Sequence, residues 1–171
     1  MDVKQAILTK RAVRQFSEQP LSPEDMQAIL DAGRRAQSSK NSQPWHFIAI
    51  RDAERLKQTA ALGRFGSPLE RATFAVLILT PDPAQRWSIM FDAGQAAAYM
   101  QLAAWERGIG SVPIAIYEPE KGRELFGFPD EYYLNAALAF GYPADPKTLS
   151  RPPHGQDGRK ARDEIFHWEQ W

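Results

Sequence analysis

The 171-residue chain contains no cysteine, and this absence removes several classes of chemistry at once. Disulfides, thiolate nucleophiles, iron–sulfur clusters and cysteine-ligated zinc all require that side chain. Histidine is scarce as well, and His46, His154 and His167 are scattered without the spacing of metal ligands. We therefore expect no metal site.

An excess of charge of either sign and a long apolar run are also missing. Basic and acidic residues number 21 each, so the formal net charge is +0 and no long-range field favours nucleic acid. The longest run expected to be buried, residues 74–79, is far shorter than the ~20 residues of a membrane helix. The N-terminus carries no apolar signal core. We expect a cytoplasmic protein with neither a nucleic-acid nor a membrane partner.

Familiar catalytic motifs are absent too. The sequence has no G-x-G-x-x-G turn, P-loop, G-x-S-x-G or H-E-x-x-H, and no paired metal carboxylates. The acids and bases that hydrolysis requires are not gathered in a recognisable motif. Such a chain is compatible with chemistry carried by a bound cofactor, which the protein positions and tunes.

What is present indicates one domain of alternating helices and strands. Apolar residues make up 43% of the chain, enough for a core at this length. Ser22 suits a helix cap, and Pro23 suits the first helical position. Apolar periodicity predicts helices at residues 2–9, 22–36, 52–62, 88–107 and 118–126, and strands at 46–51, 73–80 and 134–142. Strands separated by helices indicate an α/β or α+β fold.

The helix at residues 88–107 has almost no polar face, and Gly108 ends it. A helix that is apolar all round must be buried on all sides. A short chain has little material to wrap it, so a second subunit is the simplest cover. A central core helix in a monomer remains the alternative.

The C-terminal tail is unusually apolar for a free end, because it carries Phe166, Trp168 and Trp171. We predict that residues 159–171 dock on the core or on a partner subunit. The preceding segment, residues 142–158, contains four prolines and is expected to be a loop.

A polar stretch at residues 38–47 connects the second helix to the first strand. It carries more hydroxyl and amide side chains than a turn requires. By composition alone, a polar loop before a buried strand explains it equally well.

Four segments together resemble a known family. Residues 38–47, Ser-Ser-Lys-Asn-Ser-Gln-Pro-Trp-His-Phe, resemble the PSxxNxQPW segment of the nitroreductase family of FMN-dependent NAD(P)H oxidoreductases. Residues 10–16 resemble its RRSxRxF segment, and residues 108–113 its GxGSxP turn. Residues 158–160 and 164–168 resemble its basic C-terminal segment. The order and spacing fit a short form of the family over nearly the whole chain.

This resemblance implies a fold and an assembly. The fold would be α+β, a single domain over residues 1–171 with a mixed, mostly antiparallel central sheet flanked by helices. The protein would be a homodimer that binds FMN at the interface between subunits. It would not contain a doubly wound Rossmann sheet.

The resemblance also implies which residues hold the flavin. Lys10, Arg11 and Arg14 would meet the phosphate from one side, and Arg159 and Lys160 from the other. Arg14 and Asn41 are candidates for the ring edge. The remaining candidates are Ala12 in the first segment, Ser38 and Ser39 from the other subunit, and Ser111, Val112 and Pro113 in a turn against the ring. Taken singly, each also fits a cap, a surface ion pair or an ordinary turn.

Three departures from the family pattern affect these expectations. Ala12 replaces a common serine, so one flavin contact is lost or passes to the backbone. Gln37 replaces a proline, which leaves the following turn less rigid. Residues 115–116 are Ala-Ile where many larger members have Glu-Gly. The chain also lacks the insertions that cover the substrate in larger members.

The function implied is transfer of hydride from NADH or NADPH to FMN and then to a small conjugated acceptor, such as a nitroaromatic or quinone, in a ping-pong cycle. One alternative is a specialised flavin enzyme of the same fold, for example a dehalogenase, a flavin-fragmenting enzyme or a dehydrogenase. The other is a flavin-binding protein without turnover.

Overall fold

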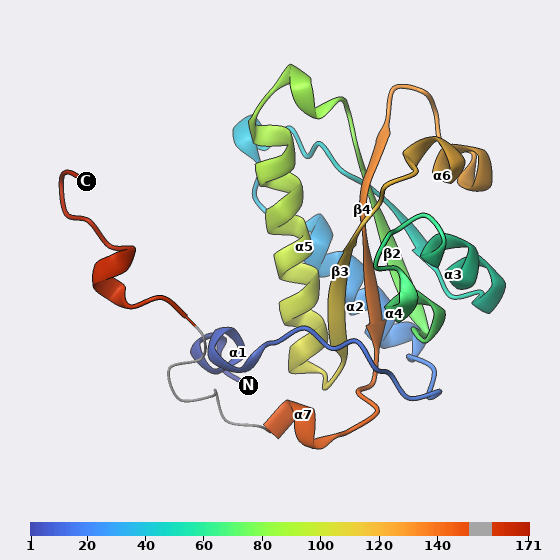
Figure 1. The fold of residues 1–171 in the computed structure, drawn as a ribbon, viewed down its shortest axis with the longest axis horizontal. Helices are drawn as coiled ribbons and strands as arrows, with labels where there is room; N and C mark the ends of the chain where they lie inside the picture. The colour runs from blue at the N-terminus through green and yellow to red at the C-terminus, as the bar shows by residue number, and fades with distance from the viewer. Residues whose placement is uncertain (151–158) are drawn as a thin grey trace.

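A four-stranded antiparallel sheet forms the centre of the computed structural model, which describes residues 1–150 and 159–171 (Figure 1). The strands are β1 His46–Ile50, β2 Phe74–Thr80, β3 Gly110–Ala115 and β4 Tyr133–Gly141, and their order is β1-β2-β4-β3. An isolated parallel bridge joins Ala12 to Ser111 beside β3. The pairing is thus mixed and mostly antiparallel, and the expected α+β fold is confirmed.

Helices cover both faces of the sheet (Figure 1). The helices are α1 Val3–Thr9, α2 Pro23–Arg34, α3 Ala53–Ala60, α4 Ser67–Glu70, α5 Ser88–Glu106, α6 Pro119–Phe126 and α7 Lys147–Ser150. Short 3-10 turns occur at Ser39–Asn41, Pro83–Gln85 and Arg162–Glu164. Because α2 packs on α5 and α3 packs on α4, each face receives a helical layer.

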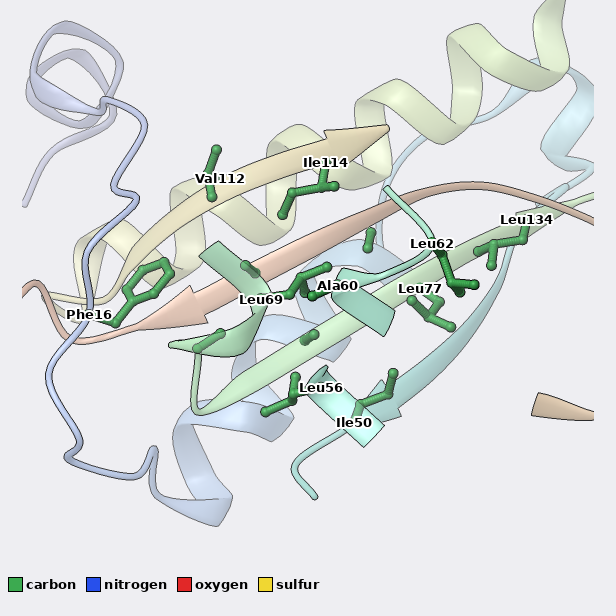
Figure 2. Packing of buried hydrophobic residues seen from close by; sticks show 14 of the residues in the cluster. Phe16, Ile50, Leu56, Ala60, Leu62, Leu69, Leu77, Val112, Ile114 and Leu134 are labelled. Carbon is green, nitrogen blue, oxygen red and sulfur yellow. The ribbon is translucent and has the colours of Figure 1, made fainter. Parts of the chain in front are cut away.

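Strand β2 is buried along its whole length because both of its faces are covered. Alternate side chains point to opposite faces of a strand. Phe74, Val76 and Ile78 therefore pack with Ile29 of α2 and Met100 of α5. The intervening positions, such as Leu77, join the opposite layer with Leu56 of α3, Leu69 of α4 and Ile114 of β3 (Figure 2).

The helix starts follow the signals in the sequence. The Ser22 hydroxyl accepts the backbone N–H of Asp25 at 3.0 Å, and Pro23 is the first residue of α2. The Asp52 carboxylate accepts the N–H of Arg55 at 2.9 Å at the start of α3. Side-chain caps of this kind satisfy N–H groups that have no partner within the helix.

One local prediction is wrong. The segment expected as a turn at residues 111–113 belongs to strand β3, which pairs with β4 over its whole length. The turn was implied by the resemblance to the GxGSxP segment. Pro113 has no N–H to donate, but β3 lies at the edge of the sheet, and an edge strand tolerates a missing N–H donor. A short helix that the periodicity does not predict, α4, begins at Ser67.

Helix α5 is not covered all round within one chain. Ile89, Ala96 and Met100 lie on its buried side, whereas Phe91 is 58% exposed. Trp87, which immediately precedes the helix, is 79% exposed, and its ring lies 5.6 Å from that of Phe91. A large apolar surface thus remains open on this helix. No helix in the described ranges is long and apolar enough to cross a membrane.

The tail at residues 159–171 extends away from the sheet, and all of its residues are exposed (Figure 1). Its own contacts are local: Glu164 accepts the N–H of Ala161 at 3.1 Å, and the rings of His167 and Trp171 stack 4.3 Å apart. Docking on a partner subunit remains a prediction. The part of the expected loop at residues 151–158 lies outside the described residues.

Candidate functional site

The basic N-terminal segment lies across the edge of the sheet, next to β3. The N–H of Val13 donates to the Ser111 carbonyl at 3.0 Å, and Ala12 pairs with Ser111 in a parallel bridge. Phe16 forms a second bridge with Pro143, just beyond β4. Two of the segments singled out in the sequence, residues 10–16 and 108–113, are therefore neighbours.

Gly110 allows this close approach. A Cβ at residue 110 would lie only 2.6 Å from the Cβ of Val13, a separation that real Cβ atoms do not show. A side chain there would push the N-terminal segment off β3. The glycine thus has a packing role in positioning the candidate site.

A buried polar network lies under the same junction. Lys10 donates through Nζ to Oε1 of Gln101 on α5, and the Ser111 hydroxyl donates to the same oxygen at 3.5 Å. The Gln101 amide nitrogen donates to the Ala97 carbonyl at 3.2 Å. Gln101 is only 9% exposed. Its side chain therefore ties the N-terminal segment and β3 to one helix.

Lys10 is a partly buried cation. Burial lowers the pKa of Lys10, because desolvation disfavours the charged ammonium. No carboxylate in the described ranges forms an ion pair with Lys10, and its acceptor is the neutral Gln101 amide. A phosphate placed nearby would offset the desolvation of the ammonium.

A pocket of about 540 Å³ opens beside β3. Its lining combines three parts of the chain, namely Arg14, the residues Arg64, Phe65, Ser67 and Pro68, and the β3 residues Val112, Pro113, Ile114 and Ala115. Pockets of this size suit a small organic ligand. The sequence predictions for Arg14, Val112 and Pro113 converge on it.

The contribution of residues 64–68 was missed. Their only local signal is the pair of glycines, Gly63 and Gly66, that flank Arg64 and Phe65. Glycines commonly mark turns, and a turn does not by itself indicate a site. Only the packing of this turn beside β3 reveals its role.

The pocket carries two guanidinium groups that bind no other side chain or backbone group among the described residues. Within residues 1–150 and 159–171, neither Arg14 nor Arg64 takes part in a hydrogen bond or an ion pair. Val112 and Ile114 supply apolar surface beside them. The arrangement suits a planar ligand whose edge carries oxygen or nitrogen acceptors.

The polar loop at residues 38–43 lies elsewhere, near the start of α5. The N–H of Ser39 donates to the Asp92 carboxylate at 3.1 Å, and the N–H of Gln43 donates to the Ser38 hydroxyl at 2.9 Å. Asp92 is 2% exposed, which is unusual for an acid. Its burial fixes the loop against α5.

The backbone of this loop is strained. Lys40, Asn41 and Gln43 have positive φ angles of 53°, 54° and 45°. Side-chain-bearing residues adopt this region at a cost, and such residues cluster at functional sites. The Asn41 side chain is exposed.

The loop and the pocket do not meet within one chain. Asp92, which holds the loop, and Gln101, which holds Lys10, are separated on α5 by about 13 Å at the usual helical rise. Ser38, Ser39 and Asn41 are not among the described residues that line the pocket with Arg14.

The predicted phosphate-binding residues Arg11, Arg159 and Lys160 are not among the residues that line the pocket. Arg159 and Lys160 are exposed on the tail, next to residue 158, which lies outside the described residues. Arg11 donates through Nε to the Thr9 carbonyl at 3.1 Å. No cluster of three metal-ligating side chains is found in the part of the chain that the structure describes.

The fold and the pocket together define the class of protein. An antiparallel sheet between helical layers is shared with the solved structure of an FMN-dependent nitroreductase from Clostridium difficile R20291. The two chains are 25% identical, superpose with a TM-score of 0.86, and cover 99% of this chain and 100% of the other.

The chain belongs to the Nitroreductase family, whose sequence profile matches residues 7–65 and 64–142. An Archaeoglobus fulgidus protein provisionally named NADH dehydrogenase/NAD(P)H nitroreductase is 36% identical over 174 residues, 96% of either chain. The iodotyrosine deiodinase of Thermotoga neapolitana is 30% identical over 168 residues, covering 81% of this chain and 87% of the relative.

Proposed function

We propose that this protein is an FMN-dependent oxidoreductase that takes hydride from NADH or NADPH and reduces a small conjugated acceptor, such as a nitroaromatic or a quinone. Membership of the Nitroreductase family supports this assignment. The observation that carries it is the pocket beside β3, where Arg14 has no partner in the described residues and faces a ligand-sized space.

The residues present fit the three parts of FMN. A phosphate needs cations, and half-buried Lys10 lacks an anionic partner within the described residues. The ring edge needs donors, which Arg14 supplies from within the pocket. The ring face needs an apolar surface, which β3 supplies. The proposed contacts are Lys10, Arg11, Arg159 and Lys160 to the phosphate, Arg14 and Asn41 to the ring edge, Ala12, Ser38 and Ser39 along the cofactor, and Ser111, Val112 and Pro113 under the ring.

When bound, FMN would supply the redox chemistry, accepting a hydride from the nicotinamide and passing two electrons to the second substrate. The chain's own residues bind and orient it. The Arg14 guanidinium favours negative charge at the ring edge. Because one pocket would serve donor and acceptor in turn, the nicotinamide leaves before the acceptor enters, which is a ping-pong cycle. For a quinone, NAD(P)H and a proton are consumed, and NAD(P)⁺ and the hydroquinone are released.

We further propose that the site is completed by a second copy of the chain. The loop at residues 38–41 lies away from the pocket of its own chain, so these residues would serve the partner's flavin. Exposed apolar side chains on α5, just before it and on α1 offer the surface for association, namely Phe91, Tyr99, Trp87, Val3, Ile7 and Leu8. A cytoplasmic location also remains a prediction.

A second candidate function is reductive dehalogenation. The match to an iodotyrosine deiodinase favours reductive dehalogenation as an activity of the same flavin site. Slow reduction of every nitro and quinone acceptor, together with fast reduction of the flavin by NAD(P)H, would favour this alternative.

The test begins with the visible spectrum of the purified protein. We expect a yellow protein, or one that gains flavin absorbance when FMN is added, and anaerobic NADH or NADPH should bleach the flavin band. A colourless protein that does not bind FMN would refute the proposal. A yellow protein whose flavin resists reduction would be a binding protein without turnover.

Arg14→Ala tests the pocket itself. Loss of a charge-assisted contact should weaken FMN binding by about 1.5–3 kcal/mol, which is roughly a 10- to 150-fold rise in Kd. Fluorescence titration with FMN measures this change. Arg51→Ala is the matched control, because Arg51 is exposed at the end of β1, the opposite edge of the sheet. Equal FMN affinity in both variants would remove Arg14 from the site.

A further inference from the structure

The turn between α3 and α4 presents one cation and one aromatic ring. The N–H of Gly66 donates to the Gly63 carbonyl at 3.1 Å, which closes a four-residue turn with Arg64 and Phe65 at its centre. Both central side chains are exposed, and Phe65 is 74% exposed. An aromatic ring so exposed contributes little to the core.

The turn is held firmly by backbone contacts. The N–H groups of Tyr117 and Glu118, just beyond β3, donate to the Leu62 carbonyl at 2.9 and 3.2 Å. A Cβ at Gly66 would lie 1.9 Å from the Ala60 carbonyl oxygen, so the turn packs directly on the end of α3. The positions of the Arg64 and Phe65 backbones are therefore set by the fold.

These two side chains line the pocket that Arg14 also lines. None of the described residues that line this pocket is acidic. Arg64 has no hydrogen-bond or ion-pair partner among the described residues, so its charge is not used to hold the fold together. With Arg14 assigned to the flavin edge, Arg64 remains for a second ligand.

We propose that Arg64 and Phe65 form an acceptor subsite that selects aromatic substrates carrying a carboxylate. This inference rests on the proposed function and names its substrate class. A guanidinium binds a carboxylate through two parallel N–H···O bonds, and a phenyl ring stacks on an aromatic substrate. The fixed turn holds the two groups side by side, so one substrate engages both.

The test compares two substrates that differ mainly in charge, para-nitrobenzoate and its methyl ester. With the FMN-loaded protein and saturating NAD(P)H, kcat/KM should favour the carboxylate about tenfold to a hundredfold. Arg64→Gln should bring this ratio close to one by raising KM for the carboxylate. Phe65→Ala should lower kcat/KM for both substrates by a similar factor. Arg51→Gln is the control and should leave the ratio unchanged.

A binding measurement separates this inference from the proposed function. Benzoate, which is not reduced, should bind the FMN-loaded protein in calorimetric titrations, and Arg64→Gln should weaken it about tenfold or more. Binding of benzoate that depends on Arg64 in a protein that reduces no acceptor would refute the proposed activity and support the subsite. Reduction of both substrates with equal kcat/KM in the unaltered protein would overturn the subsite and leave the proposed function standing.

Two further outcomes would overturn the assignment of Arg64 to the acceptor. A rise in the Kd of FMN in Arg64→Gln, with the substrate ratio unchanged, would show that Arg64 contacts the flavin. In the second, the Arg64→Gln variant, unlike the unaltered protein, bleaches the flavin more slowly with NADPH than with NADH, and the substrate ratio is again unchanged. This result would show that Arg64 binds the 2′-phosphate of NADPH.

Discussion

At the residue scale, Gln101 is a buried polar side chain on a mostly apolar helix. It is an amide within an otherwise apolar stretch of α5, and its oxygen accepts from both Lys10 and Ser111. Burying a polar group is costly unless its hydrogen bonds are made, and here they are made. The amide therefore supports the position of Lys10 beneath the proposed flavin site.

Gln101→Leu should destabilise the protein by about 1–3 kcal/mol, because the partly buried Lys10 ammonium would lose its acceptor. Denaturant unfolding at neutral pH measures the loss. Gln95→Leu on the same helix is the control, since Gln95 accepts from exposed Gln37 and should change stability by less than about 0.5 kcal/mol. A loss no larger than that of the control would show that the network contributes nothing.

At the element scale, one carboxylate links three elements. Asp25 of α2 accepts from Arg107 at the end of α5 at 2.9 Å and from the Tyr142 hydroxyl, after β4, at 3.0 Å. Burial raises the pKa of Asp25, but the hydrogen bonds from Ser22, Arg107 and Tyr142 and the guanidinium charge outweigh it. The pKa of Asp25 therefore lies below its usual 3.8. Burial and the bond to Asp25 also raise the pKa of Tyr142.

The sign of the pH dependence follows from this lowered pKa. The ionised carboxylate stabilises the fold at all pH values above about 4, and the stabilisation is lost as the pH falls through the folded-state pKa of Asp25. Asp25→Asn should cost about 1–2 kcal/mol at pH 7, and this difference should shrink below pH 3. Thermal unfolding at both pH values measures it. Asp31→Asn removes an exposed carboxylate paired with Arg34 on the same helix and should have little effect at either pH.

At the scale of the whole molecule, the single chain leaves too much apolar surface in water. Trp87 and Phe91 lie side by side at the start of α5, and Val3, Ile7 and Leu8 are exposed on α1, which contacts α5. Exposed apolar patches of this kind mark association surfaces. Together with the separation of the loop at residues 38–41 from the pocket, they favour a dimer with shared sites.

Phe91→Glu should convert the protein to a monomer, because it places a charge in the centre of this surface. Size-exclusion chromatography with light scattering gives the mass, and FMN titration should show weakened binding in the same variant. Tyr133→Glu, which alters an exposed aromatic residue at the start of β4, should leave both unchanged. A Phe91→Glu dimer with normal FMN affinity would place the interface elsewhere.

The sequence by itself determined most of the elements, and tertiary structure decided the others and which elements meet. Helices α2, α3 and α5 and the buried strand β2 could be predicted because caps and apolar periodicity are local signals. The turn expected at residues 111–113 is a strand because β4 supplies its hydrogen bonds, and no short window of sequence contains that partner. Similarity to a family indicated Arg14, but only the packing of the Gly63–Gly66 turn against the end of β3 brings Arg64 and Phe65 to the same pocket. Contacts between residues far apart in sequence depend on how the layers pack, and the sequence alone contains no local signal for them.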